Sequence, residues 1–302
     1  MQMPDFPNDV IGVDIGGTRI KFGLFDASDG SILQQHTVPT RDGEWSGSDP
    51  AWAVAIREYV AAVEKERGPA RAVGIAAPGL AAADNHCIVK MPGRLQGLEG
   101  LDWAQWLGRP ASVLNDAHAA LLGECWCGAA RGLRHVVLLT LGTGVGGAIL
   151  IDGKLLQGHT GRAGHLGHLT VDADGPPTIA GMPGGLDSII GNATVAARSE
   201  NRFTSTAELT DAVRSGDPFA TAVWERSVYQ LACGVGSLLN VLDPEAVVIG
   251  GGIAEVGDLL FLPLRQHLDK IEWRPLGNAT PVLPALLGEW AGTFGAAKFA
   301  LR

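Results

Sequence analysis

The sequence lacks the features of a membrane protein and of a nucleic-acid-binding protein. No apolar run among its 302 residues reaches eighteen, the length typical of a membrane-spanning helix. The formal net charge is −9, whereas binding to a phosphate backbone depends on clustered Lys and Arg. Asp5 and Asp9 stand where a signal peptide would be basic. We therefore expect a cytoplasmic protein without a membrane or nucleic-acid partner.

Cysteine is scarce, and the few cysteines do not form a metal motif. Cys125 and Cys127 are two positions apart, with no second pair to complete a zinc ribbon. We interpret them, with Cys87 and Cys233, as reduced structural residues of a cytoplasmic protein. Hydrophobic residues make up 46% of the chain and charged residues 18%. This composition and length fit two folded domains.

Two glycine-tipped hairpins are the strongest local signals. Residues 10–26 and 134–152 each contain two apolar runs joined by a glycine-rich turn, which predicts two strands and a tight connection. Aligning the hairpins places Gly16 on Gly142 and Leu24 on Leu150. This repeat predicts two similar α/β halves, each presenting a hairpin tip at a cleft between them.

The rest of the chain alternates between short buried strands and helices. Helices are predicted where apolar residues recur at helical spacing and stop at Gly or Pro. Residues 158–191, rich in Gly, Pro and His, are expected to form an ordered loop. The predicted strands are residues 72–77, 112–115 and 246–249, and the predicted helices are 49–67, 116–130, 206–242 with a weak point at 216–218, and 292–301.

The glycine turns are suited to phosphate binding, because backbone N–H groups can surround a phosphate where no Cβ obstructs it. Neither turn is followed by the Gly-Lys-Ser/Thr of a Walker A loop or by the helix of a dinucleotide-binding fingerprint. Asp14, at the end of a predicted strand, could hold a hydrated Mg²⁺. Ordinary turn geometry alone would also explain one such hairpin, but two in register favour a phosphate site.

These segments resemble the ROK family of bacterial sugar kinases, within the actin-like, hexokinase-type (ribonuclease H-like) ATPase fold. The resemblance rests on DIGGT from Asp14, Pro-Gly at Gly79, NDA from Asn115, LGTGVGGAI from Leu141, GRAGHLGH at 161–168 and IGGGI at 249–253. It covers nearly the whole chain in order. It implies a two-domain α/β protein with an interdomain cleft, ATP and Mg²⁺ as cofactors, and a homodimer. We divide the chain into a small domain, residues 1–114 with 291–302, and a large domain, residues 115–290.

The resemblance also assigns site residues. Asp116 corresponds to the general base that accepts the proton of the sugar hydroxyl, although its position also suits a helix N-cap. The implied ATP and phosphate contacts are Asp14, Gly16, Gly17, Thr18, Lys21, Gly142, Thr143, Gly144, Gly250, Gly251 and Gly252. The implied sugar contacts are Gly79, Arg94, Asn115, Asp116, His165, His168 and Asp187.

Three departures from the family pattern bear on metal and substrate. The positions of the family's zinc-binding cysteines hold Thr178, Ala180 and Gly185, so we expect no zinc and a loop held by packing and hydrogen bonds. The usual Glu of the GExGH segment is His165, whose neutral imidazole offers one donor and one acceptor to sugar hydroxyls. Arg94 replaces an Asn, and it could reach a hydroxyl, an anionic group or solvent.

The leading interpretation is an ATP-dependent hexose kinase of glucokinase type in carbohydrate metabolism, acting on the 6-hydroxyl. The alternative is a kinase for an amino or N-acetylated hexosamine, such as N-acetylmannosamine or N-acetylglucosamine. A sugar-sensing ROK protein without catalysis is less supported, because Asp14, Asp116 and both glycine turns are present. A transcriptional repressor would carry a DNA-binding segment before DIGGT, and we expect none here.

Overall fold

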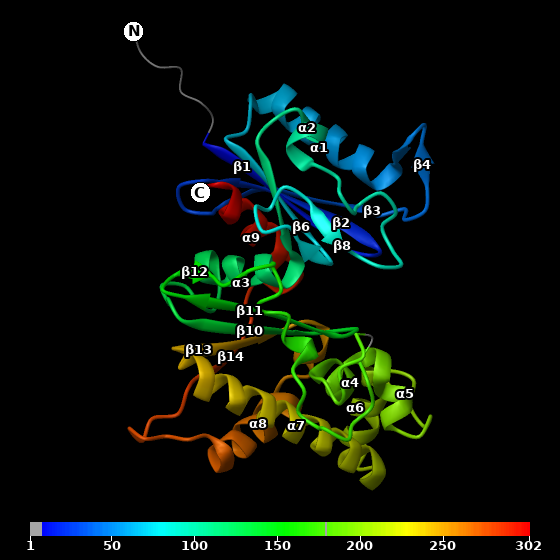
Figure 1. Cartoon of the computed structure of the whole chain (residues 1–302), viewed down its shortest axis with the longest axis vertical. Helices are drawn as coiled ribbons and strands as arrows, with labels where there is room; N and C mark the ends of the chain where they lie inside the picture. Colours follow the sequence, from blue (N-terminus) through cyan, green and yellow to red (C-terminus); the bar gives the residue numbers. More distant parts are fainter. Residues whose placement is uncertain (1–7, 179) are drawn as a thin grey trace. The chain divides into compact units, whose positions relative to one another are not determined.

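The computed structural model describes residues 8–178 and 180–302, and the chain divides into two compact units (Figure 1). The first unit comprises Met1–Gly132, described from Asn8 onward, with Gln157–Ala163 and Leu287–Arg302. The second comprises Leu133–Leu156 and Gly164–Leu286. Both combine a five-stranded mixed sheet with helices, as the α/β prediction requires.

The sheet of the first unit has the order β3-β2-β1-β6-β9. Strands β1 (Asp9–Ile15), β2 (Arg19–Asp26) and β3 (Ile32–Pro39) form an antiparallel meander, and β6 (Ala72–Ala77) and β9 (Ala111–Asn115) continue parallel to β1. The predicted hairpin at 10–26 and the predicted strands 72–77 and 112–115 are confirmed. Strand β3 was not expected, because its side chains are mostly exposed and show no buried apolar pattern.

Helices cover both faces of this sheet. Trp52, Ile56 and Val60 of α1 (Ala51–Arg67) share a core with the sheet residues and with Trp103 of α2 (Trp103–Leu107). On the other face lies α9 (Ala291–Ala300), in red in Figure 1, whose Phe294 packs on β1 and β2. The minor strands β4 (Trp45–Ser46), β5 (Asp49–Pro50), β7 (Leu80–Ala81) and β8 (Ile88–Lys90) form two small hairpins.

Helix α3 (Asp116–Cys127) packs closely on α9 and belongs to the first unit. A Cβ on Gly295 would collide with the backbone carbonyl of Ala119, and one on Gly123 would collide with the backbone carbonyl of Ala291. Glycine therefore permits the two backbones to approach. The structural division consequently differs from the sequence division at 114/115, because residues 115–132 pack with the N-terminal strands.

The second unit repeats the topology of the first, with the strand order β12-β11-β10-β13-β14. Strands β10 (Val136–Leu141), β11 (Val145–Ile151) and β12 (Lys154–Leu155) are antiparallel, whereas β13 (Ala246–Gly250) and β14 (Val282–Pro284) run parallel to β10. The predicted repeat of the hairpin is thus present. Its alignment was wrong beyond the turn: Leu24 pairs with Ile11, and the equivalent partner of Val137 is Ile149 instead of Leu150.

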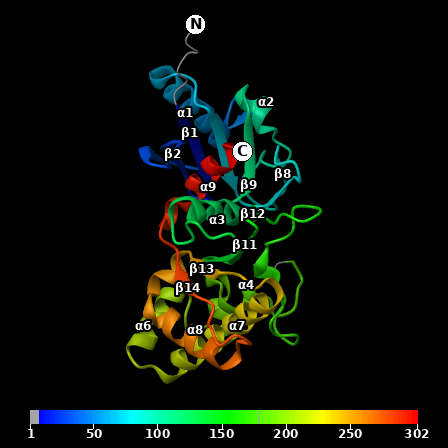
Figure 2. The same cartoon turned by 90° about the vertical axis from the view of Figure 1, so that its left-hand side faces the viewer.

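The helices α7 (Pro218–Leu242) and α8 (Asp258–Ile271) pack on this second sheet (Figure 2). The predicted helical region 206–242 is confirmed, with the break at 216–218 separating α6 (Thr206–Arg214) from α7. Within the described part of the chain, no helix combines the length and apolar character needed to cross a bilayer.

Residues 158–191 form mainly loop, as expected, but two short helices were missed. These are η1 (Leu166–His168) and α4 (Leu186–Ile190), and α4 is followed by η2 (Asn192–Thr194) and α5 (Val195–Arg198). Leu186 and Ile190 are fully buried in the core of the second unit. Tertiary burial therefore forms α4, despite glycines on both sides. The remaining short helices are η3 (Gly252–Val256) and η4 (Gly288–Trp290).

Candidate active site

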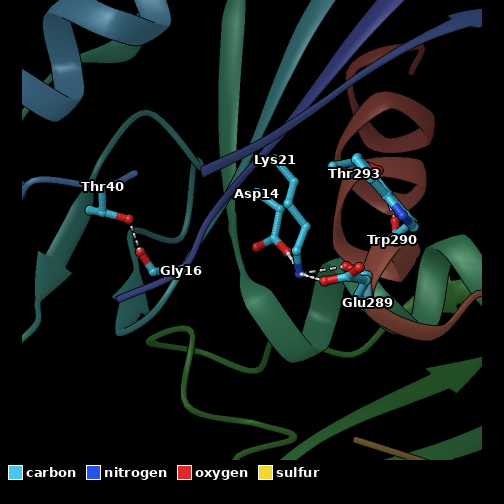
Figure 3. A network of polar contacts seen from close by, with 7 residues as sticks. All are labelled: Asp14, Gly16, Lys21, Thr40, Glu289, Trp290 and Thr293. Atoms are coloured by element: carbon cyan, nitrogen blue, oxygen red, sulfur yellow. Dashed lines mark hydrogen bonds and ion pairs between the residues drawn. The ribbon is translucent and has the colours of Figure 1, made fainter. Parts of the chain in front are cut away.

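The first hairpin places a carboxylate and an ammonium group opposite each other. Asp14 pairs with Lys21 across β1 and β2, and Lys21 Nζ lies 3.9 Å from Asp14 Oδ2. The same ammonium donates to the carbonyl of Glu289 at 2.8 Å and lies 3.5 Å from its carboxylate (Figure 3). Glu289, in η4 next to α9, was missed because it is remote in sequence.

Burial gives Asp14 an unusual protonation behaviour. Its carboxylate lies against Gly292 at the start of α9, where a Cβ would be 2.7 Å from Asp14 Cγ. Burial raises the pKa of Asp14 to about 7; Lys21 opposes this, and the charges of Asp116 and Glu289 add to it. The site can therefore take up either a proton or a cation.

Thr40 braces the glycine turn of the first hairpin. Its hydroxyl donates to the Gly16 carbonyl at 2.7 Å (Figure 3). Its backbone N–H donates to the Thr18 carbonyl at 2.9 Å. Thr40 is fully buried, while Gly17 and Thr18 are exposed. Thr40 thus fixes the turn from its buried side, while the exposed side of the turn is accessible to a ligand. Sequence reasoning missed Thr40 because it lies beyond β3.

Arg94 lies at this turn. Its Nη1 would be 2.6 Å from a Cβ on Gly17, so the guanidinium rests on the glycine. Its loop is anchored by the Leu95 N–H, which donates to Asp42 at 2.9 Å. Arg94 is exposed, so a hydroxyl, an anionic group and solvent all stay open as the partners of its guanidinium.

Asp116 is the first residue of α3, but Asn115 caps the helix. The Asn115 side-chain oxygen accepts from the N–H groups of Ala117 and His118 at 3.0 and 3.3 Å, and its amide donates to the Gly79 carbonyl at 3.0 Å. The Ala117 N–H also donates to Asp116 Oδ1 at 2.8 Å. The N-cap of α3 is therefore Asn115 and not Asp116. The hydrogen bond from Ala117 orients the Asp116 carboxylate, which does not serve as the N-cap.

The surroundings of Asp116 perturb its carboxyl group. Burial raises its pKa, while the hydrogen bonds from Ala117 and Asn115 and the charge of Arg94 lower it. Asp116 nevertheless reaches solvent, which weakens any effect of burial. The position of Asp116 and its hydrogen bonding, and not its pKa, support its role as the candidate proton acceptor.

In the second unit, a cavity of about 440 Å³ adjoins the second glycine turn. Gly142 and Thr143 line it together with Gly252 and Ile253, and α6 adds Thr206 and Asp211. The cavity thus brings two of the predicted glycine motifs together. Gly250 is buried within β13, and Gly251 packs on the backbone of Leu141 with φ +87°; both shape the turn from behind. No sequence motif marks Thr206 or Asp211, so nothing in the sequence indicated that α6 lines this cavity.

His165, His168 and Asp187 lie near the same turn. His165 precedes η1 and His168 ends it, with His168 Nδ1 3.8 Å from Asp187 Oδ2. Burial, with a smaller effect of His168, lowers the pKa of His165, so its imidazole is neutral near pH 7. Asp187 also accepts from the Val145 N–H at 2.5 Å. Gly144 faces this carboxylate instead of the cavity.

The loop that departs from the zinc pattern is held by hydrogen bonds, as expected. The Thr178 N–H donates to the Met182 carbonyl at 2.8 Å, and the Met182 N–H donates to the Thr178 hydroxyl oxygen at 3.2 Å. The Gly184 N–H donates to the Pro176 carbonyl. In residues 8–178 and 180–302, no group of three His, Cys, Asp or Glu side chains is placed to bind a metal. The expected absence of zinc stays a prediction.

The predicted site residues divide between the two units. Nine lie in the first and nine in the second, and within each unit they gather at the hairpin turn and the segments beside it. The first unit holds Asp14, Gly16, Gly17, Thr18, Lys21, Gly79, Arg94, Asn115 and Asp116, and the second holds Gly142, Thr143, Gly144, His165, His168, Asp187, Gly250, Gly251 and Gly252.

Comparisons with known proteins show which family the sequence resembles. The profile of the ROK family matches residues 10–302. A glucokinase of Thermotoga maritima is 34% identical over 317 residues, covering 96% of each chain. An N-acetylgalactosamine kinase of Shewanella is 30% identical, covering 82% of this chain and 83% of its own.

Solved structures extend the agreement to the fold. The ROK hexokinase of Thermus thermophilus has a TM-score of 0.81 at 32% identity, covering 97% of this chain and 98% of its own. A ROK family glucokinase of Streptomyces griseus, solved with glucose and AMPPNP, has a TM-score of 0.77 at 30% identity and covers 97% and 99%. The predicted actin-like kinase fold is confirmed.

Proposed function

The chain belongs to the ROK family and is an ATP-dependent sugar kinase, and we propose that it phosphorylates the 6-hydroxyl of a hexose, with glucose the first candidate. The observation that carries the catalytic assignment is the capping of α3 by Asn115. It leaves the adjacent Asp116 carboxylate oriented at a helix start and accessible to a substrate hydroxyl.

In the proposed reaction, Asp116 accepts the proton of the attacking hydroxyl. The hydroxyl oxygen forms the new bond to the terminal phosphorus of ATP, and the bond to the bridging oxygen breaks to release ADP. Transfers of this kind depend mainly on positioning and neutralisation of charge. We assign Gly79, Asn115, His168 and Asp187 to contacts with the sugar.

The nucleotide assignment follows the glycine turns. The amides of the exposed residues Gly17 and Thr18 would contact phosphate oxygens. In the second turn those of Thr143 and Gly144 would do so, because the Gly142 N–H already donates to the Gly144 carbonyl. The 440 Å³ cavity beside Gly252 would take the adenosine. Such a cavity is within the usual size of small-molecule sites.

The donor set beside Lys21 fits a cation. Asp14 and Glu289 already supply oxygens around the ammonium of Lys21, and carboxylate oxygens are the ligands that hydrated Mg²⁺ prefers. Asp14 would hold Mg²⁺ through its water shell, and the ion would neutralise phosphate charge. Lys21 and Arg94 would add positive charge beside the turn.

A hexosamine kinase is the second candidate, and the neutral His165 favours it. An imidazole presents one donor and one acceptor where a carboxylate would only accept, so it recognises a different pattern of hydroxyl or amide groups. The similarity to the N-acetylgalactosamine kinase supports keeping this alternative. A non-catalytic sugar sensor has no observation in its favour. A homodimer stays a prediction, which light scattering would test.

The test is a coupled ADP-release assay with Mg–ATP against glucose, mannose, fructose, glucosamine, N-acetylglucosamine, N-acetylmannosamine and N-acetylgalactosamine. We expect one strongly preferred sugar, and Asp116→Asn should greatly lower the kcat for it. A hexosamine as that sugar would replace glucose by the second candidate. If none of these sugars gave ADP release while nucleotide binding was intact, the kinase proposal would be contradicted and a sensor would be favoured.

A further inference from the structure

Asp187 lies between the second glycine turn and the histidine-bearing helix η1. Its Oδ1 accepts the N–H of Val145 at 2.5 Å, and Val145 is the first residue after the turn. A Cβ on Gly144 would lie 3.0 Å from the same oxygen, and one on Gly167 would collide with it. Glycine at both positions thus admits the carboxylate between the two segments.

The segment that carries Asp187 also holds the turn from its other end. The N–H groups of Asn192 and Ala193 donate to the carbonyls of Gly142 and Thr143, each at 2.9 Å. Asp187 itself is held in place, because its helix α4 buries Leu186 and Ile190 in the core. One short, well-anchored segment therefore fixes the turn at its first two residues and just past its last one.

The second oxygen of the carboxylate faces the other candidate ligand site. Asp187 Oδ2 lies 3.8 Å from His168 Nδ1, and His168 is a proposed sugar contact. The side chain of Asp187 is 19% exposed, so its interactions with the protein are only partly weakened by solvent. The same group contacts the phosphate turn and the imidazole.

We propose that Asp187 is a positioning residue that fixes the Gly142–Gly144 turn, through the Val145 N–H that follows it, for the phosphates of the nucleotide and links that turn to His168. The role is distinct from a sugar contact, because the Val145 N–H is a backbone group of the nucleotide turn. The inference rests on the proposed function in naming Mg–ATP as the ligand of the turn. The hydrogen bond by which Asp187 fixes the turn does not depend on which nucleotide the turn binds.

The consequence of losing the carboxylate follows from the hydrogen bond. A bond from a backbone N–H to an ionised acceptor is about twice as strong as a neutral one, and its removal leaves the turn held from one side. A turn that must be ordered again on binding loses affinity, by about tenfold for one charged hydrogen bond. Asp187→Asn keeps an acceptor of the same shape, so its effect should be smaller than that of Asp187→Ala.

The experiment measures nucleotide binding without any sugar. Isothermal titration with Mg–AMPPNP should give a Kd about tenfold higher for Asp187→Ala and about twofold to threefold higher for Asp187→Asn. Amide exchange of residues 142–147 should be faster in both variants. Asp269→Asn is the matched control, because Asp269 of α8 accepts a hydrogen bond from Arg274 in the same unit; the Kd of this variant and its exchange of 142–147 should stay at wild-type values.

The outcomes separate this inference from the proposed function. Unchanged nucleotide Kd and unchanged exchange in Asp187→Ala, with only the KM for sugar raised, would overturn the positioning role and leave a plain sugar contact. Faster exchange of the turn, in an enzyme that phosphorylates no sugar of the panel, would support the positioning role and contradict the proposed substrate. Should Asp187→Ala fail to fold, the exchange of 142–147 in Asp187→Asn decides, and wild-type exchange there would overturn the inference.

Discussion

The buried carboxylate of Asp14 should make the nucleotide-free protein less stable as the pH rises. Its pKa is about 7 in the fold instead of 3.8, and each pKa unit corresponds to 1.36 kcal/mol. The ionised group therefore costs the fold up to about 4 kcal/mol above pH 7. The side chain is 17% exposed, so we expect about 2 to 4 kcal/mol.

The sign follows from the direction of the pKa change. A raised pKa means that the folded chain binds the proton more tightly than the unfolded chain, so this stabilisation is complete below pH 3.8 and is lost between pH 3.8 and 7. Asp14→Asn removes the titration, while Lys21 keeps Glu289 as its partner. The variant should exceed the wild type in stability, with an advantage that grows from pH 5 to pH 8 by about 2 kcal/mol.

The assay is urea unfolding of both proteins at pH 5 and pH 8, in EDTA and without nucleotide. Asp29→Asn is the control, because that side chain is exposed and its removal should change stability equally at both pH values. An advantage of Asp14→Asn that is the same at pH 5 and pH 8 would refute the reasoning. The same variant should also bind Mg–AMPPNP more weakly, if Asp14 holds the cation.

Four further results are expected. Asp116→Asn should lower kcat by about 10³-fold or more while the Kd for Mg–AMPPNP changes less than about twofold; retained turnover in the coupled assay would exclude it as the base. His165→Glu should shift kcat/KM toward glucose and away from N-acetylated hexosamines, and an unaltered sugar profile would show that His165 does not read the substrate. Arg94→Ala should raise the KM for Mg–ATP about tenfold, with Arg94→Lys intermediate; a rise confined to the sugar KM would place Arg94 on the sugar. Elemental analysis should find no stoichiometric zinc, and a tightly bound zinc would contradict the interpretation of the loop around Thr178.

Local signals made the hairpins predictable, and distance in sequence hid their supports. An apolar run on each side of a glycine pair specifies a strand, a turn and a second strand without knowledge of the rest of the chain. Thr40 and Glu289 reach the first hairpin from 24 and 268 residues away. Nothing in their own surroundings distinguishes them, because their role exists only once the sheet and α9 have formed.

The missed helix α4 and the difference between the sequence division and the structural division of the chain have the same physical origin. A five-residue helix between glycines has no favourable propensity of its own, and burial of Leu186 and Ile190 supplies what the local sequence lacks. Similarly, α3 joins the first unit because Gly123 and Gly295 allow its backbone to approach α9. Both facts concern contacts between distant segments, which periodicity cannot report.

The two hairpins share a topology but distribute charge differently, and this difference separates their roles. The cross-strand pair Asp14–Lys21 of the first hairpin corresponds to Thr140–Gly146 in the second. The first hairpin thus brings its own carboxylate and ammonium to the turn, whereas these positions of the second offer no ionised group. The carboxylate at the second turn comes instead from α4, as Asp187. Substitutions at the first pair should therefore act on cation and phosphate charge, and substitutions at Asp187 should act on the geometry of the turn.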